Sequence, residues 1–449
     1  MGKSDADEKA RQKRRQKKIE RNRRKRKKKL ANRRKSYGSP MRPGTPKPPK
    51  VTKKRVKEIR ERLRFYREKA ELSQGLIAKQ FKNEVQFPTS FSLIENPNST
   101  LKTIGELVQT CSRRKRGRVI LDQRKCERID YGAQSLVSMI IKAGAQGLRN
   151  KIEGAFPEND LLRKTVYATG LPKELDLDPL PEFEHYPLQT GRKNIDRGHT
   201  SSSKERETGN FVAHIDRCLK RQEYALSWNG KNYLGELVSE VIGNAEDHGQ
   251  RDEWWIGGYM YDPGENERGD CYFTVFNLGQ TIYQSLQNLP GDAELRKDMD
   301  TLVDKHTSFF ARRTTYGRPQ LETLYALQQG VSRFKTGRES VAPDRGQGTV
   351  DMITHFQQLG QTDEKGIEPQ MCLISGDTYI RFDENYDMQE SKDGRKIIAF
   401  NSDNDLRQPP DRRNVRKLNW FFPGTVISGR FYIDPRYLSR ENGGHYESN

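Results

Sequence analysis

The sequence lacks the long hydrophobic segments that membrane insertion and secretion require. No stretch of about 18 consecutive apolar residues occurs, and the N-terminus has no apolar segment of the kind that follows the charges of a signal peptide. These absences argue against a membrane-spanning or secreted protein, and we expect no membrane partner. The expected location is cytoplasmic, or nuclear if the chain is eukaryotic.

Cysteine is scarce, and its distribution argues against a disulfide scaffold or a structural zinc site. There is no C-x-x-C pair, and the five cysteines are scattered along the chain: Cys111, Cys126, Cys218, Cys271 and Cys372. A reducing compartment fits this pattern best.

Positive charge is concentrated in residues 1–50. This segment holds 22 basic and 4 acidic side chains, so it carries +18 of the net formal charge of +21 in a chain of 449 residues. Its low-complexity, Pro-rich composition predicts a disordered basic tail. Contact with nucleic-acid phosphates is one reading, and a solubilising or nuclear-import segment is another. No aromatic residue precedes Tyr37, so stacking on bases is not expected.

The rest of the chain has room for two domains, and its patterns predict an α+β fold in two unequal parts. Residues 51–84 are expected as a helical segment, because Val56, Ile59, Leu63, Tyr66 and Ala70 follow helical spacing. Three further parts follow from composition: an α/β module at 85–170, a linker rich in Pro, charge and Ser at 171–209, and a second domain at 210–440.

Apolar periodicity places further elements inside these parts. In the module we expect a helix at 101–111, a strand at 118–122 and a helix around 133–141. In the second domain we expect helices at 215–219 and 233–248, a hairpin formed by strands at 254–261 and 271–276, and a helical insertion at 283–345. Further strands are expected at 371–375, 378–382, 396–400 and 425–433.

The helix G-E-L-V-S-E-V-I-G-N-A-E-D-H-G carries the chemistry of most interest. Glu240, Asn244 and either Asp247 or His248 fall on one face, at steps of four, seven and eight residues. An amide oxygen can hold Mg²⁺, and a carboxylate one turn away can orient a water as general base. From the spacing alone, a solvated polar face is the favoured interpretation.

This helix resembles the N-box of the GHKL ATPase superfamily. The string S-E-V-I-G-N-A-E-D-H-G is most similar to that of the bacterial anti-sigma-factor serine kinases. The resemblance implies a Bergerat-type α/β sandwich that binds ATP and Mg²⁺. Glu240 would be the general base and Asn244 the Mg²⁺ ligand, with Asp247 and His248 beside the nucleotide.

Three later segments resemble the other boxes of that superfamily, in the same order. In F-T-V-F-N-L-G-Q-T-I, Asn277 replaces the Asp that accepts from the adenine amino group, Gly279 matches and Thr281 replaces a second Gly. An amide oxygen can still accept that hydrogen bond, without charge. In F-P-G-T-V, Thr425 would sit beside the adenine-binding side chain.

The segment D-R-G-Q-G-T-V-D-M resembles the second glycine box. Gly346 and Gly348 would let backbone N–H groups approach the phosphates, and the helix near Thr349 would present its positive end to them. Lys335, Arg338 or Arg345 could reach the γ-phosphate from the insertion; the sequence does not choose among them.

The module at 85–170 resembles a STAS domain through V-I-L-D-Q-R-K-C-E-R-I-D-Y-G-A-Q-S-L-V, although a generic strand-helix unit fits the same residues. STAS domains of this kind accept phosphate on a Ser after the Asp, and here Tyr131 follows Asp130. The nearest hydroxyls are those of Tyr131 and Ser135, so a docking or sensing surface is expected rather than a phosphoacceptor.

The expected function is therefore Mg²⁺-dependent binding and hydrolysis of ATP by a nucleotide-gated regulatory switch. One alternative is a protein serine kinase of the anti-sigma type. Another is a nucleotide-sensing module without turnover that contacts nucleic acid through its tail. The protein partner and the oligomeric state stay open, with a homodimer as one alternative.

Overall fold

The computed structural model describes most of the chain after residue 52, namely residues 53–74, 83–113, 117–174, 186–192, 203–221, 223–248, 253–260, 270–288, 294–310, 317–331, 347–360, 368–391 and 394–440. Contacts group Thr52–Asn449 into one compact unit, apart from Met1–Val51. The predicted basic tail, residues 1–50, lies outside the described residues. The compact unit is a mixed α/β structure.

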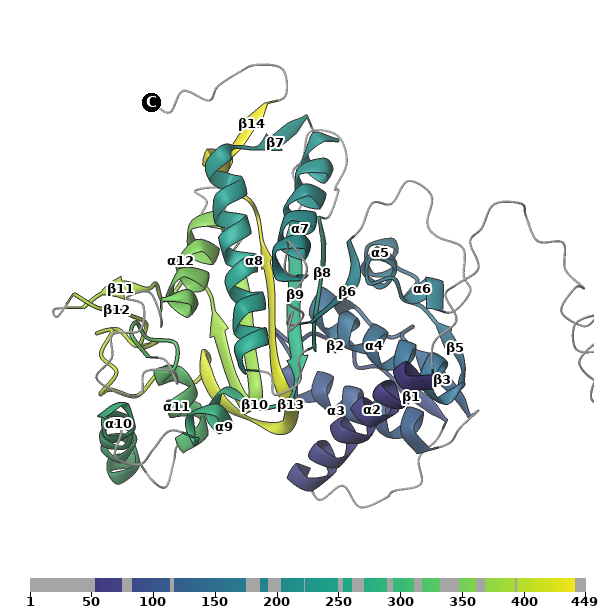
Figure 1. Ribbon diagram of the computed structural model, residues 1–449, viewed down its shortest axis with the longest axis horizontal. Helices are drawn as coiled ribbons and strands as arrows, with labels where there is room; N and C mark the ends of the chain where they lie inside the picture. Colours follow the sequence, from purple (N-terminus) through teal and green to yellow (C-terminus); the bar gives the residue numbers. More distant parts are fainter. Residues whose placement is uncertain are drawn as a thin grey trace, which may run out of the picture. The chain divides into compact units, whose positions relative to one another are not determined.

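A five-stranded antiparallel sheet forms the centre of the unit (Figure 1). Its order is β10-β13-β9-β8-β6, with bounds Gln370–Phe382, Val415–Phe431, Cys271–Leu278, Glu253–Met260 and Tyr186–Arg192. The predicted hairpin is confirmed, because β8 and β9 pair antiparallel. The two short strands expected at 371–375 and 378–382 are one strand, β10, whose register shifts at Gly376, where φ is +64°.

Three helices cover one face of this sheet: α7 (Ser203–Lys220), α8 (Trp228–His248) and α12 (Gly348–Gly360). The apolar stripe predicted for α8 is confirmed as its buried side: Leu234, Leu237, Val238, Val241, Ile242 and Ala245. This stripe packs in one hydrophobic cluster with residues of β8, β9 and α12 such as Ile256, Val275 and Phe356. The stripe therefore fixes which face of α8 remains for chemistry.

The N-terminal part of the unit contains a small parallel sheet, in the order β1 (Glu84–Gln86), β3 (Arg118–Asp122), β5 (Lys151–Ala155). The helix, strand and helix predicted here are confirmed as α3 (Pro97–Arg113), β3 and α4 (Tyr131–Ala143). The remaining elements are α2 (Lys53–Gln74), β2 (Ser90–Phe91) paired with β4 (Arg128–Ile129), a π-helix η1 (Gly144–Leu148), α5 (Asp160–Ala168) and α6 (Leu171–Glu174).

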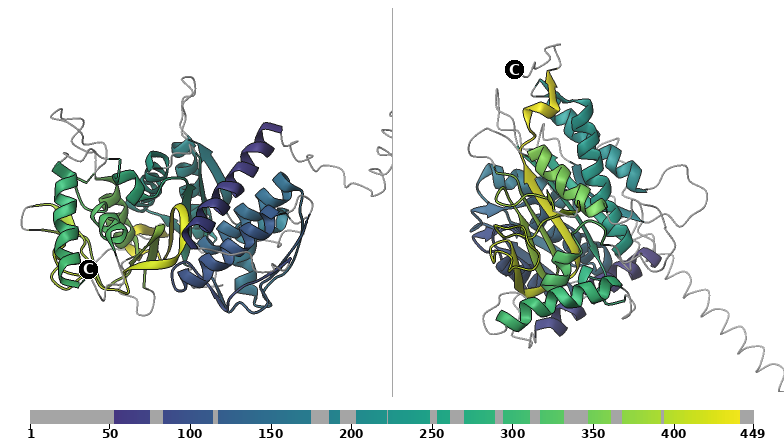
Figure 2. Two further views of the ribbon diagram at one scale, coloured as in Figure 1. Left: turned by 90° about the horizontal axis from the view of Figure 1, so that it is seen from below. Right: turned by 90° about the vertical axis from the view of Figure 1, so that its left-hand side faces the viewer.

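This N-terminal module packs directly on the second face of the large sheet. Side chains alternate along β9, so Val275 belongs to the cluster under α8 whereas Phe276 and Leu278 belong to the cluster shared with the module. The shared cluster also contains Leu136 of α4 and Phe422 of β13. Figure 2 (left) shows the purple and blue helices of the module on the other side of β13 from the green helices. The module and the sheet thus share one core.

The segment 171–209, expected as a linker, contains regular structure. It holds α6, the strand β6 and the start of α7. The composition hid β6, since Y-P-L-Q-T-G-R contains both a proline and a glycine, which are depleted in strands. An edge strand tolerates Pro187, and Gly191 is needed because a side chain there would overlap the indole of Trp254. The sheet therefore includes a strand, β6, that the sequence pattern did not predict.

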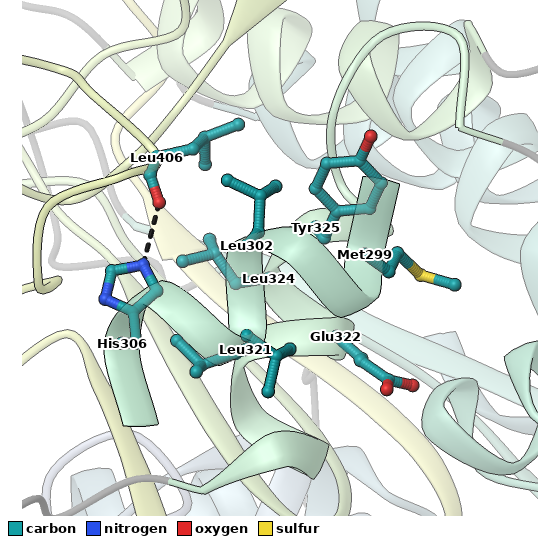
Figure 3. A pocket seen from close by; sticks show the side chains of 9 residues that line it. Met299, Leu302, His306, Leu321, Glu322, Leu324, Tyr325 and Leu406 are labelled. Carbon is teal, nitrogen blue, oxygen red and sulfur yellow. Dashed lines mark hydrogen bonds between the residues drawn. The ribbon is translucent and has the colours of Figure 1, made fainter. Parts of the chain in front are cut away.

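In the insertion expected at 283–345, the residues that the structure describes are mainly helical, as predicted: α9 (Ile282–Leu286), α10 (Glu294–Phe310) and α11 (Arg318–Tyr325). A cavity of about 20 Å³ lies between α10 and α11, and His306 Nε2 donates to Leu406 O at its edge (Figure 3). The buried Glu322 of α11 accepts from Gln287, just after α9, at 2.6 Å and pairs with Arg296 of α10 at 3.8 Å, so it ties the three helices together. Burial raises the pKa of its carboxyl.

Five short elements complete the described part of the unit. Strand β7 (Tyr224–Leu226) pairs with β14 (Leu438–Arg440), and β11 (Gln389–Glu390) pairs with β12 (Lys396–Ile397). A 3₁₀ turn, η2 (Pro435–Tyr437), precedes β14. The strand expected at 396–400 is therefore confirmed only over its first two residues, and the one expected at 425–433 lies within the longer β13 up to Phe431.

Candidate functional site

Four segments that are far apart in the sequence meet at the C-terminal end of α8. They are the polar face of α8, the end of β9, the start of α12 and the middle of β13. The contacts that join them are one close approach between α8 and α12 and two hydrogen bonds through Asn277. The predicted boxes are thus brought together in space.

Glu240 lies against Gly348, at the first residue of α12. A Cβ built on Gly348 would overlap Glu240 Oε2, so only glycine leaves room for the carboxylate in this position. Glu240 is half-buried. The first backbone N–H groups of a helix carry its positive end. The arrangement therefore places a carboxylate beside a helix N-terminus, next to the half-buried Thr349.

Asn244 is one turn further along α8 and is half-buried. Its side chain makes no hydrogen bond to any residue that the structure describes. Its amide is therefore available to a ligand beside Glu240. Asp247 and His248 follow as the last residues of α8, and their side chains lie outside the described part.

Asn277 has a structural role that the sequence did not indicate. Its side chain is fully buried, Nδ2 donates to Ala245 O at 2.8 Å, and Oδ1 accepts from Thr425 N at 3.0 Å. The amide thus joins the end of α8 to β13. The sequence suggested a side chain that faces a base, and in this structure each of its polar atoms already has a backbone partner.

Thr425 lies opposite Asn277 in the β9–β13 ladder. Its hydroxyl is 2.8 Å from that of Ser375 on β10, and Ser375 Oγ also accepts from Ile282 N at 2.9 Å. Gly279, the other matched residue of this box, donates through its N–H to Pro423 O at 3.0 Å. The end of the sheet is therefore closed by a small hydrogen-bonded network.

Two residues of this network were missed by sequence reasoning. Ser375 is buried, and it stands before the register shift at Gly376, which the sequence pattern showed only as a break between two strands. Gly424 has a φ of +150°, and a side chain there would overlap Asn277 O. The sequence pattern gave a role only to Thr425 of the Gly424-Thr425 pair. In the structure, Gly424 is the residue that lets β13 approach β9 closely.

Several predicted residues lie outside the described part of the chain, so the structure does not place them. They are Gly346 of the second glycine box and the three cationic residues Lys335, Arg338 and Arg345.

The STAS-like segment holds its hydroxyls inside the protein. Asp130 is the N-cap of α4, and its carboxylate accepts from the backbone N–H groups of Leu93, Ile94 and Ala133. Tyr131 and Ser135 are 1% and 0% exposed, and burial raises the pKa of the Tyr131 phenol. Neither hydroxyl is accessible to a phosphoryl donor in this structure.

No protein-family model, curated protein or solved structure matches this chain. Among the residues that the structure describes, no group of three or more His, Cys, Asp or Glu side chains is placed to hold a metal ion. The five cysteines are buried, and none of them forms a disulfide. None of the described helices is long and apolar enough to cross a membrane.

Proposed function

We propose that this protein binds ATP with Mg²⁺ between α8 and the start of α12 and hydrolyses it. The observation that carries the proposal is the contact of Glu240 with Gly348. That contact puts a carboxylate beside a helix N-terminus, and Asn244 lies one turn further along α8. A general base, phosphate-binding N–H groups and a Mg²⁺ ligand are the groups that nucleotide hydrolysis needs.

Glu240 orients and deprotonates the attacking water in this proposal. Asn244 offers its amide oxygen to Mg²⁺, and its lack of a hydrogen-bond partner among the described residues fits that task. When bound, the metal neutralises charge on the phosphate oxygens. The backbone N–H groups at Gly348 and Thr349 bind phosphate, and Gly346 precedes them in the sequence.

The base of the nucleotide is proposed to contact Asn277 and Thr425. After its two backbone bonds, the Asn277 side chain keeps one N–H and one oxygen lone pair. Because the side chain is fully buried, a base reaches it only if neighbouring side chains move apart. Binding is therefore expected to loosen the network that Thr425 and Ser375 form at this end of the sheet.

That network gives a route from nucleotide to the helical insertion. Ser375 Oγ accepts from the N–H of Ile282, the first residue of α9. On α11, Gln320 Nε2 donates to Asp377 Oδ1 at 3.1 Å, two residues after Ser375 on β10. A shift of Ser375 would therefore change the hydrogen bonds that hold α9 and α11 on β10. In this way nucleotide binding would alter the surface of the helical insertion that a partner protein contacts.

The test compares ATP binding and phosphate release by the full chain with those of two glutamate variants. Glu240→Ala should keep nucleotide binding and lower turnover by about 10² to 10⁴, as loss of a general base does. Glu236→Ala is the matched control, because Glu236 lies one turn earlier on α8 and pairs with His355 at 3.1 Å. Hydrolysis that Glu240→Ala leaves unchanged would rule out the assigned role.

A second readout separates hydrolysis from phosphotransfer. With γ-labelled ATP, the proposal predicts that label appears as free phosphate and that none is retained on the protein. The buried Tyr131 and Ser135 hydroxyls agree with this expectation. Label that passes to a serine of an added protein would favour the kinase alternative instead.

A further inference from the structure

A second cavity, remote from the residues assigned to the nucleotide, lies between the N-terminal module and the large sheet. Its volume is about 340 Å³, and residues of α4, α5, β8, β9, β10 and β13 line it. At about 30 Å³ for each water molecule it has room for roughly eleven. Its size lies at the lower end of the range for small-molecule sites, about 300 to 1,000 Å³.

One wall of this cavity is apolar and rigid. Tyr272 stacks on Tyr259 with ring centroids 4.9 Å apart and an interplanar angle of 8°, and the Tyr259 hydroxyl is hydrogen-bonded to that of Thr165. Leu161 of α5 faces the same cavity and is 39% exposed, although it is a large hydrophobic residue. An apolar group of a ligand would cover both Leu161 and the Tyr272 ring.

The rim carries two guanidinium groups with unused donors. Arg128 Nη1 donates to both carboxylate oxygens of Glu95, at 3.0 and 2.9 Å, which leaves its Nε and Nη2. Arg430 Nε donates to Asp270 Oδ2 at 2.7 Å, which leaves Nη1 and Nη2. Guanidinium groups bind carboxylates with paired, charge-assisted hydrogen bonds.

The rim also carries one unpaired carboxylate. Glu127 is exposed and lines the cavity beside Arg128, and its side chain forms no ion pair or hydrogen bond with the residues that the structure describes. The other two carboxylates that line the cavity are already engaged: Glu95 pairs with Arg128, and Asp130 accepts from three backbone N–H groups. The rim thus offers both signs of charge with unused capacity.

We propose that this cavity binds a free amino acid with a large apolar side chain. Its carboxylate would pair with Arg128 and Arg430, its ammonium group with Glu127, and its side chain would lie on Tyr272 and Leu161. A ligand with a single charge meets a like charge on the rim, whereas a zwitterion pairs with both signs. The proposal uses none of the residues assigned to the nucleotide and does not rest on that assignment.

The test is equilibrium dialysis of the full chain, without nucleotide, against labelled L-phenylalanine, L-leucine and L-tryptophan. At least one should bind saturably at millimolar concentration or below. For the tightest of them, the analogue without the ammonium group and the analogue without the carboxylate should each compete at least about tenfold more weakly, because a hydrogen bond to a charged group contributes about 1.5–3 kcal/mol. With phenylalanine these analogues are 3-phenylpropionate and phenethylamine. Glycine, which lacks the apolar part, should compete at least about tenfold more weakly too.

Variants of the rim provide the second arm. Arg128→Gln, Arg430→Gln and Glu127→Gln should each weaken binding about tenfold or more, with melting temperatures near that of wild type. Arg124→Gln is the control, because Arg124 is an exposed arginine of the same loop that pairs with Asp122 outside the cavity. Binding should be unchanged in Arg124→Gln and in Glu240→Ala, so a failed nucleotide assignment would leave this result intact.

Three outcomes overturn the proposal. The first is no saturable binding of any of the three amino acids. The second is equal competition by an analogue that lacks one of the charges. The third is wild-type affinity in all three rim variants.

Discussion

The change Asn277→Asp tests whether this side chain joins α8 to β13 as described. In the wild type Nδ2 donates to Ala245 O, and the amide is fully buried. An ionised Asp has no donor for that carbonyl, and it places a carboxylate oxygen against the carbonyl oxygen. A protonated Asp can donate its O–H to Ala245 O while its other oxygen still accepts from Thr425 N.

The size of the effect depends on pH. Burial should raise the pKa of the new carboxyl in the folded state above its unfolded value of about 3.9, and shifts of about 2 to 3 units are expected for such sites. Between the two pKa values the folded state holds the proton and the unfolded state does not, so stability falls as pH rises. At about 1.4 kcal/mol per unit, the loss grows to about 3 to 4 kcal/mol above the folded pKa.

The assay is urea unfolding of wild type and variant from pH 5 to pH 8, followed by the fluorescence of the buried Trp254 and Trp255. The difference in unfolding free energy should grow with pH and then become constant. Asn277→Ala is the control, since it also removes the donor but cannot titrate, and its loss should stay the same at every pH. A difference that is flat or shrinks with pH for Asn277→Asp would refute the reasoning.

Two further predictions follow from Gly348 and from the tail. Gly348→Ala should lower ATP turnover at least about tenfold at nearly unchanged stability, because the added methyl group displaces the flexible end of Glu240. Gly235→Ala, a control on α8 away from Gly348, should leave ATP turnover as in wild type. Equal turnover in the two variants would contradict the proposed site. Removal of residues 1–50 should flatten the salt dependence of nucleic-acid binding and leave ATP affinity unchanged. Each neutralised duplex phosphate contributes about −0.9 to the slope of log K against log salt concentration. Equal nucleic-acid binding with and without the tail would place that contact in the folded unit.

Sequence patterns predicted the elements that carry a clear local signal, either an apolar stripe at helical spacing or apolar runs around a turn. Helix α8 was placed by Leu234, Leu237, Val238 and their successors, and the β8–β9 hairpin by two apolar runs around a turn. Helix α8 has one buried stripe, whereas β8 and β9 are continuous apolar runs that are buried on both faces of the sheet. A local signal of either kind is sufficient to identify the element.

The elements that the sequence did not predict depend on tertiary contacts. Strand β6 is held by its pairing with β8 and by the fit of Gly191 against Trp254, neither of which appears in its composition. The shared core likewise depends on residues such as Phe276 and Leu136, which are ordinary apolar residues in two distant segments. No local signal indicates that they face each other.

The sequence predicted which residues belong to the candidate site better than it predicted what each of them does. Glu240 and Gly348 were singled out separately, and the structure shows that they touch. Asn277 was singled out for a base contact, but its amide holds two backbone partners, because a buried polar side chain at a strand end must satisfy its hydrogen bonds. Such a role depends on what lies opposite, which the sequence does not reveal.

The most direct test of the nucleotide assignment is calorimetric titration of the full chain with ATP, with Mg²⁺ and after chelation, in wild type and Asn244→Ala. Saturable binding is predicted for wild type with Mg²⁺, together with a marked loss of affinity both on chelation and in Asn244→Ala. Absence of saturable ATP binding, or an affinity that neither Mg²⁺ nor Asn244→Ala alters, would contradict the account.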